Sequence, residues 1–253
     1  MGAAAQGRGD STGGLLATPR AILADLDGCL ISGDRALPGA AAFAAAAGAR
    51  LWIVSNNSTD TEDGLASRLA GLGVEAAPGR MALAGVETLR RIRDERGGCA
   101  VALYAAPPIR AFAEALGLRL DAADPEVVVV ARDPGLDLGA LATLLGQLHR
   151  GAALVATNLD GAHPGRDGAP APETGALVAA IRAAMPEARP VSLGKPAPDL
   201  LRIALMRAGV APSEALFVGD NDETDGRAAA ALGVAFRRID PARGPAALLG
   251  GAA

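Results

Sequence analysis

The sequence is short of several residue types, and each shortage excludes a class of function. Only 2% of the 253 residues are aromatic, and the formal net charge is −4. Few aromatic rings are available to stack on single-stranded nucleic acid. A weakly acidic chain also offers no basic surface for nucleic acid or for an anionic membrane. We therefore expect neither a nucleic-acid partner nor a membrane partner.

Cysteine is scarce as well, and long apolar runs are missing. Cys29 and Cys99 are the only two cysteines and lie far apart, so the chain has no disulfide framework and suits a reducing cytoplasm. No apolar run approaches the ~20 residues of a membrane-spanning helix. Residues 1–18 lack the charged start and apolar core of a secretory signal. Their Gly, Ala and Ser content predicts a flexible leader.

What the chain does contain is a regular alternation of short apolar runs and helical segments, with 50% hydrophobic residues in all. This alternation predicts a doubly wound α/β fold with a parallel sheet. The predicted strands and helices of the main unit are 21–24, 40–47, 50–54, 61–72, 199–208, 215–219, 226–232 and 234–237.

The same alternation repeats in the middle of the chain and predicts a second α/β unit. We place this unit at residues 79–190, inserted in a main unit made of residues 19–78 and 191–253. Inside it, residues 81–95 are predicted as one helix. Residues 163–172 are predicted as a loop because they are rich in Pro and Gly. The tail after Asp240 is predicted to be loosely held.

Two acids end the first apolar run. Asp25 and Asp27 follow Ala21–Ala24 and precede Gly28. Alternate side chains of a strand share a face, and open α/β sheets bind ligands at the carboxyl ends of their strands. Two carboxylates this close repel each other unless a cation or a shared proton separates their charges. The pair therefore predicts a metal and substrate site, the plain alternative being a surface turn after an edge strand.

Polar residues follow other runs in the same way. Ser55 and Asn56 follow the second strand, Asp220 and Asp225 follow the strand at 215–219, and Lys195 stands in a turn. In a doubly wound sheet such strand ends converge on one edge. Hard carboxylate oxygens with few competing nitrogen or sulfur ligands suit Mg²⁺. Charge neutralisation and a proton donor at such a site are what phosphoryl transfer requires.

Four segments, taken in order, resemble the motifs of haloacid dehalogenase (HAD) superfamily phosphatases. They are DLDG at 25–28, SNNST at 55–59, GKP at 194–196 and GDNDETD at 219–225. Three further stretches resemble the NagD-like (type IIA) subfamily, which includes phosphoglycolate and para-nitrophenyl phosphatases: GCLISGDRALPGA at 28–40, ATNLD at 156–160 and ETGALVAAI at 173–181. The resemblance spans about residues 20–240. It implies a Rossmann-like HAD core with the second unit as a large inserted α/β cap.

The resemblance also implies a role for each motif residue. Asp25 is implied as the nucleophile that forms an aspartyl-phosphate, and Asp27 as general acid and then base. Mg²⁺ is expected on the carboxylates of Asp25 and Asp220 and on the backbone carbonyl of Asp27. The other implied roles are phosphate binding by Ser55, Asn56 and Lys195, support by Asn221 and Asp225, and substrate contacts from the cap by Thr157, Asn158 and Asp160.

These features predict a Mg²⁺-dependent phosphatase that hydrolyses a small phosphorylated metabolite in the cytoplasm. Two alternatives stay open at this point: a phosphotransferase that uses the same aspartyl-phosphate, and a catalytically idle regulator that binds a phosphometabolite. The resemblance makes a homodimer through the cap plausible, while the identity of the substrate is not encoded in the motifs. The extra acids Asp222 and Glu223 are expected to be solvated.

Overall fold

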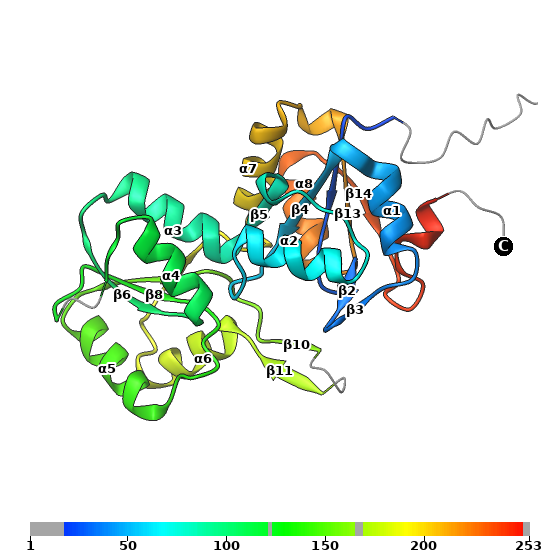
Figure 1. Cartoon of the computed structure of the whole chain (residues 1–253). Helices are drawn as coiled ribbons and strands as arrows, with labels where there is room; N and C mark the ends of the chain where they lie inside the picture. The colour runs from blue at the N-terminus through cyan, green and yellow to red at the C-terminus, as the bar shows by residue number, and fades with distance from the viewer. Residues whose placement is uncertain (1–17, 121–122, 165–168, 250–253) are drawn as a thin grey trace, which may run out of the picture.

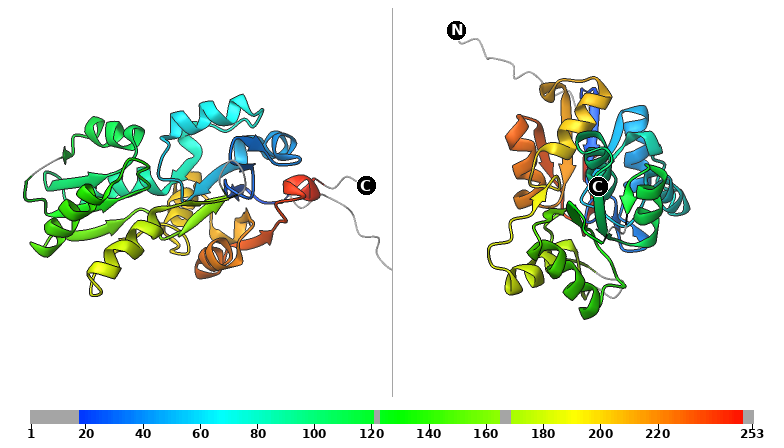
Figure 2. Two further views of the ribbon diagram at one scale, coloured as in Figure 1. Left: turned by 90° about the horizontal axis from the view of Figure 1, so that it is seen from below. Right: turned by 90° about the vertical axis from the view of Figure 1, so that its left-hand side faces the viewer.

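A computed structural model describes residues 18–120, 123–164 and 169–249, and shows two α/β units lying side by side (Figure 1). Residues 1–17 of the predicted leader lie outside the described residues. Each unit is built on its own five-stranded parallel sheet. The view from below separates the same two units, the cap in green and yellow and the core in blue, orange and red (Figure 2). The predicted α/β class with an inserted second unit is confirmed.

The core sheet has the strand order β14-β13-β1-β4-β5. Its strands, in chain order, are β1 (Ala21–Ala24), β4 (Leu51–Ser55), β5 (Met81–Leu83), β13 (Ala215–Gly219) and β14 (Ala235–Arg238). Its helices are α1 (Ala40–Ala47), α2 (Glu62–Gly71), α7 (Asp199–Ala208) and α8 (Arg227–Leu232).

Helices cover both faces of the core sheet because both faces of its strands are apolar. In β1, Ile22 and Ala24 belong to a cluster that includes Phe43 of α1. Ala21 and Leu23 point to the opposite face, in a cluster that includes Leu201 of α7. A strand buried on both faces is expected in a parallel sheet, which explains why the sequence here reads as an unbroken apolar run.

The cap sheet has the strand order β12-β9-β8-β6-β7. Its strands are β6 (Ala100–Tyr104), β7 (Arg119–Leu120), β8 (Val127–Val130), β9 (Ala153–Ala156) and β12 (Val191–Ser192). Its helices are α3 (Ala84–Glu95), α4 (Pro107–Ala115), α5 (Leu138–His149) and α6 (Thr174–Ala184). Side chains of α3 and α4 pack on one face of this sheet and side chains of α5 and α6 on the other.

Two strands belong to the other unit than the predicted boundaries of the cap, 79 and 190, assign them to. Met81–Leu83, predicted as the first turn of a helix, forms β5 and pairs with β4 in the core sheet. Three apolar residues fit a short strand as well as a helix start, so periodicity alone could not separate the two. Val191–Ser192 pairs with β9 in the cap sheet. The chain therefore crosses between the sheets after Leu83 and after Ser192, a few residues beyond positions 79 and 190.

Two other sequence predictions are wrong. The segment 163–172 is not simply a loop, because β10 (Ala162–Pro164) and β11 (Pro170–Pro172) pair as an antiparallel hairpin; residues 165–168 of that prediction lie outside the described part. A two-stranded ribbon leaves one side of each strand unpaired, so it tolerates proline. The described part of the tail, residues 241–249, is not loose either. Gly244–Leu248 form a short 3-10 helix in which Pro245 and Leu248 are buried; residues 250–253 of that prediction lie outside the described part.

A second hairpin lies beside the end of β1. Its strands, β2 (Ile31–Ser32) and β3 (Arg35–Ala36), occupy the segment between β1 and α1. Within the described ranges no helix combines the length and the apolar character needed to cross a lipid bilayer.

Candidate active site

The carboxyl ends of the core strands face a cavity of about 830 Å³ between core and cap. Since β13, β1 and β4 are adjacent and parallel, the residues that follow them lie at one edge of the sheet. Eight of the residues predicted for the site line this cavity: Asp25, Asp27, Ser55, Asn56, Asp160, Lys195, Asp220 and Asn221. The convergence expected from the sequence is therefore present.

Lys195 lies at the bottom of the cavity and bridges two carboxylates. Its Nζ is 2.6 Å from Oδ1 of Asp25 and 2.7 Å from Oδ1 of Asp225. Lys195 is the only lysine in the chain, and its side chain is 2% exposed. Burial opposes its charge, but the charges of Asp225 and Asp25 raise the pKa of the ammonium above its usual value. Asp225 thus holds a charged lysine against Asp25.

The Lys195 segment is also tied to the loop that follows β4. The backbone N–H of Lys195 donates to Oδ1 of Asn56 at 2.7 Å, and Nδ2 of Asn56 donates to the backbone carbonyl of Lys195 at 3.0 Å. This reciprocal pair fixes the position of the lysine relative to the end of β4. Two segments 139 residues apart in the chain are joined in this way.

Three carboxylates form a cluster able to hold a metal ion. One oxygen each from Asp25, Asp220 and Asp225 lies within 4.8 Å of the others. Burial, with the charge of Asp225, raises the pKa of the Asp220 carboxyl, and the same two causes raise that of Asp25. A cation relieves such repulsion between carboxylates. Because all three donors are hard oxygens, the set fits Mg²⁺.

Two glycines make room for this cluster. Gly28 has a positive φ of 80°, and a Cβ at this position would overlap the Asp220 carboxylate. A Cβ at Gly219, the last residue of β13, would overlap the carboxylate of Asp225. The glycines of two motifs therefore let the acidic side chains approach the backbone closely.

Asp27 stands at the cavity wall, three residues after the end of β1. Water can reach its side chain from the cavity, but protein atoms of the core and the cap surround this part of the cavity. This burial raises the pKa of its carboxyl, and the positive charges of Arg68 and Lys195 only partly oppose the shift. A carboxyl with a raised pKa can keep a proton nearer to neutral pH, which is what a general acid needs.

The loop after β4 is ordered by its own side chains. Oγ of Ser55 accepts the backbone N–H of Asn57 at 3.1 Å. Oδ1 of Asn57 accepts the N–H groups of Thr59 and Asp60 at 3.1 and 2.9 Å. From the cap, Asp160 reaches this loop and accepts a hydrogen bond from Nδ2 of Asn56 at 2.9 Å. Asp160 is therefore the predicted cap residue that lies in the cavity.

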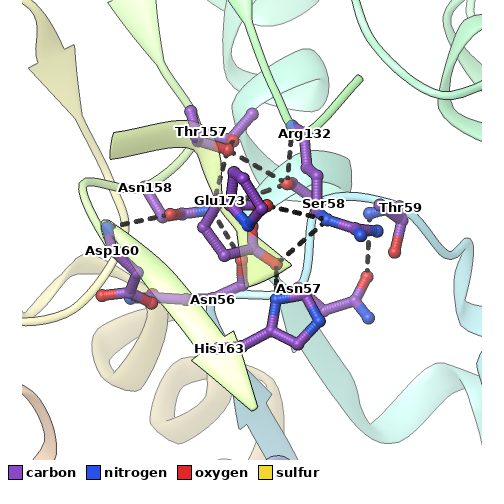
Figure 3. Close-up of polar contacts among 12 residues, drawn as sticks. Asn56, Asn57, Ser58, Thr59, Arg132, Thr157, Asn158, Asp160, His163 and Glu173 are labelled. Carbon is purple, nitrogen blue, oxygen red and sulfur yellow. Dashed lines mark hydrogen bonds and ion pairs between the residues drawn. The ribbon is translucent and has the colours of Figure 1, made fainter. Parts of the chain in front are cut away.

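Thr157 and Asn158 do not line the cavity, so the prediction that they contact substrate is not supported. Both are fully buried, in a polar network between core and cap (Figure 3). Nδ2 of Asn158 donates to the Asn56 carbonyl at 2.8 Å, and Thr174 Oγ1 lies 3.4 Å from the hydroxyls of Ser58 and Thr157. Because these groups satisfy one another, they hold the cap on the β4 loop.

Three cap residues that sequence reasoning did not select also line the cavity (Figure 3). Glu173 Oε1 lies 2.7 Å from Nδ1 of His163 and 3.4 Å from Nε of Arg132. Burial raises the pKa of Glu173 to about 7. The three residues are at least ten positions apart in the sequence and share no motif, so only the fold brings them together. We call Arg132, His163 and Glu173 the cap cluster.

Family models match both parts of the core and the first part of the cap. A model described as "Haloacid dehalogenase-like hydrolase" matches residues 22–119, and one described as "HAD-hyrolase-like" matches residues 192–237. Among curated proteins, chronophin from Mus musculus is 33% identical over 233 residues, which cover 86% of this chain and 80% of chronophin.

Solved structures show the same arrangement of core and cap. NagD from E. coli K-12 is similar with a TM-score of 0.78 and 26% identity, over 93% of this chain and 90% of that one. Glycerol phosphate phosphatase Rv1692 from Mycobacterium tuberculosis, in complex with magnesium, is similar with a TM-score of 0.79 and 28% identity. That match covers 88% of this chain and 68% of the other.

Proposed function

Because the chain belongs to the type IIA (NagD- and chronophin-like) branch of the haloacid dehalogenase superfamily, whose members are phosphatases of small phosphomonoesters, we propose that it works through an aspartyl-phosphate at Asp25 with Mg²⁺ at the acidic cluster. One observation supports this proposal above the rest. The only lysine of the chain holds the Asp25 carboxylate at 2.6 Å at the bottom of the cavity, with Asp27 two residues away on the same strand end.

In the first step, a carboxylate oxygen of Asp25 attacks phosphorus, and the bond between phosphorus and the leaving oxygen breaks. Asp27 gives its proton to that oxygen, so the product leaves as a neutral alcohol. The raised pKa of Asp27 supports this role. Lys195, Ser55 and Asn56 bind the phosphoryl oxygens and neutralise their charge.

In the second step, a water molecule attacks phosphorus, and Asp27, now ionised, takes its proton. The bond from phosphorus to Asp25 breaks, which restores the carboxylate and releases inorganic phosphate. When bound by Asp25, Asp220 and the backbone carbonyl of Asp27, Mg²⁺ would supply positive charge beside the phosphoryl group. The magnesium complex of the glycerol phosphate phosphatase supports this choice of metal.

Three further points belong to the proposal. Two free, buried cysteines support a cytoplasmic location. The partner is a small phosphorylated metabolite, and a homodimer through the cap is the assembly that we propose. A phosphotransferase with the same covalent step is the competing activity; added glycerol would then appear as a phosphorylated product in place of part of the free phosphate.

The test is the Asp25→Asn variant with para-nitrophenyl phosphate as substrate and Mg²⁺ present. Asn keeps the size of the side chain and an oxygen that can accept from Lys195, so circular dichroism and Tm should stay near those of the wild type. Turnover should fall by several orders of magnitude, as for the loss of other catalytic nucleophiles. The acid-quenched wild type should carry one phosphoryl group by intact mass. Near-wild-type turnover by the variant would remove Asp25 from the reaction.

A further inference from the structure

The walls of the cavity carry more carboxylates than cations. Six aspartates and one glutamate are among its described lining residues, against three permanent cations, which are Arg68, Arg132 and Lys195. A bound Mg²⁺ and the phosphoryl group of a substrate nearly cancel each other's charge. The rest of the cavity, where the leaving group has to lie, therefore has an excess of negative charge.

Each of the three cations is already paired with a carboxylate. Nη2 of Arg68 lies 2.9 Å from Asp60, and Nε of Arg132 lies 3.4 Å from Glu173. Lys195 lies between two carboxylates, as described above. Burial and the charge of Arg132 lower the pKa of His163 below its usual 6.5, so its ring adds no charge at neutral pH. A second anionic group on the substrate would have to displace one of these partners.

The cap cluster lies where the leaving group must pass. Asp27, the proposed proton donor to the leaving oxygen, lines the same cavity as Arg132, His163 and Glu173, and its charge raises the pKa of both His163 and Glu173. The leaving group thus lies between Asp27 on the core and the cap cluster. No Phe, Tyr or Trp side chain occurs among the cavity residues that the structure describes, and the apolar contribution there comes from Ala162, Ala171 and Pro241.

From these observations we propose that Glu173, whose Oε1 lies 3.4 Å from Nε of Arg132 and 2.7 Å from Nδ1 of His163, makes the enzyme select phosphomonoesters of small, uncharged, hydroxyl-bearing alcohols over esters whose alcohol carries a second anionic group. This inference rests on the proposed function. Glu173 occupies Arg132 and repels a carboxylate on the leaving group. Its carboxylate and that of Asp160 can accept hydrogen bonds from hydroxyl groups, which a polyol supplies.

Selection of this kind should weaken when Glu173 is protonated. The charged and titratable groups around it are Arg132 after β8, His163 on β10, Asp160 after β9 and Asp27 after β1. Burial puts the pKa of Glu173 at about 7. The carboxyl is therefore mostly ionised at pH 8 and mostly neutral at pH 6, where Arg132 is free to bind a second anion.

The experiment compares glycerol 3-phosphate with 3-phosphoglycerate, which differ in one group, CH₂OH against carboxylate. The measured quantity is the ratio of kcat/KM for the two esters, by phosphate release at pH 8 and at pH 6. The wild type should favour glycerol 3-phosphate by about tenfold or more at pH 8, as a charge at roughly 8 Å acts at an effective dielectric constant of about 20. The ratio should fall at pH 6. Phosphate ionisation affects both esters and cancels in the ratio.

Two variants complete the experiment. Glu173→Gln should lower the ratio at pH 8 by about tenfold and abolish its pH dependence, mainly through a lower KM for 3-phosphoglycerate. Glu187→Gln removes the same charge near the other end of α6, roughly 17 Å of helix away, and should keep the wild-type ratio because that distance exceeds the Debye length of about 8 Å.

A wild-type preference for 3-phosphoglycerate at pH 8, or a ratio that is the same at both pH values, would overturn the inference even if the Glu173→Gln protein did not fold. An unchanged ratio in a folded Glu173→Gln protein would also overturn it. The absence of phosphate release from either ester and from para-nitrophenyl phosphate would instead count against the proposed function itself.

Discussion

Replacing Lys195 with methionine should cause a large loss of stability. Methionine has a similar length but no charge, so two carboxylates lose an ammonium group that lies 2.6 and 2.7 Å from them. Asp225 is 0% and Asp25 is 9% exposed. Removing one partner of a buried ion pair costs about 3–5 kcal/mol, because it leaves buried charge without compensation. At about 2–4 °C per kcal/mol, Tm should fall by roughly 6–20 °C.

Arg20→Met is the matched control for this experiment. Arg20 also lies close to a carboxylate, with Nη1 2.8 Å from Oε1 of Glu214, but the two side chains are 63% and 36% exposed. An exposed ion pair of this kind contributes about 0–1 kcal/mol. Both variants and the wild type should be unfolded in urea with EDTA present. Equal losses in the two variants would refute the argument that burial makes the Lys195 bridge strong.

Repeating the unfolding with Mg²⁺ tests whether Lys195 and the metal act on the same carboxylates. Without the lysine, the acidic cluster carries one more uncompensated negative charge, and affinity for a hard cation rises with ligand charge. A ligand that binds only the folded state stabilises it by RT ln(1 + [L]/Kd), so Mg²⁺ should stabilise Lys195→Met more than the wild type. Equal stabilisation would show that the two cations act independently.

Turnover by Lys195→Met should fall about 10²-fold or more, as for the loss of other groups that neutralise developing charge.

Two further substitutions separate the metal site from the contact between cap and core. Asp220→Asn should raise the Mg²⁺ concentration for half-maximal activity by about tenfold or more, because ligand charge sets the affinity for hard cations; an unchanged Mg²⁺ requirement would remove Asp220 from the metal site. Asn158→Ala removes the donor to the Asn56 carbonyl and should cost about 1–3 kcal/mol. It should also raise KM, since Asn56 belongs to the proposed phosphate loop; a loss of Tm with KM unchanged would show that Asn158 supports the fold and not the site.

The core of the site could be predicted from the sequence because its parts are local. A buried strand that ends in acids can be recognised within eight residues, as at Ala21–Gly28. In a parallel sheet the carboxyl ends of all strands lie at the same edge, so the acids that follow them meet there. The prediction that Asp222 is a solvated acid is also confirmed, because its side chain is 58% exposed and its Oδ2 lies 2.8 Å from Nη1 of Arg238.

The cap could not be predicted to the same depth because its contacts are set by packing between distant segments. Thr157 and Asn158 stand in a segment that resembles a cap signature, and nothing local tells whether such residues face a ligand or a neighbouring loop. The structure shows that Ser58 and Thr174 are their partners. In the same way, the pairing of Glu173 with Arg132 and His163 needs β8, β10 and the start of α6 to meet, which no spacing in the sequence encodes.

Asn56 connects these two parts of the molecule, and this has a consequence for how the site is assembled. Its Oδ1 accepts from the Lys195 backbone, its Nδ2 donates to Asp160, and its carbonyl accepts from Asn158. Two of these three bonds come from the cap and the third holds the segment of the lysine. A movement of the cap that breaks the bonds to Asp160 and Asn158 therefore acts on the residue that positions the lysine, so that cap position and the arrangement around Asp25 are linked through a single residue.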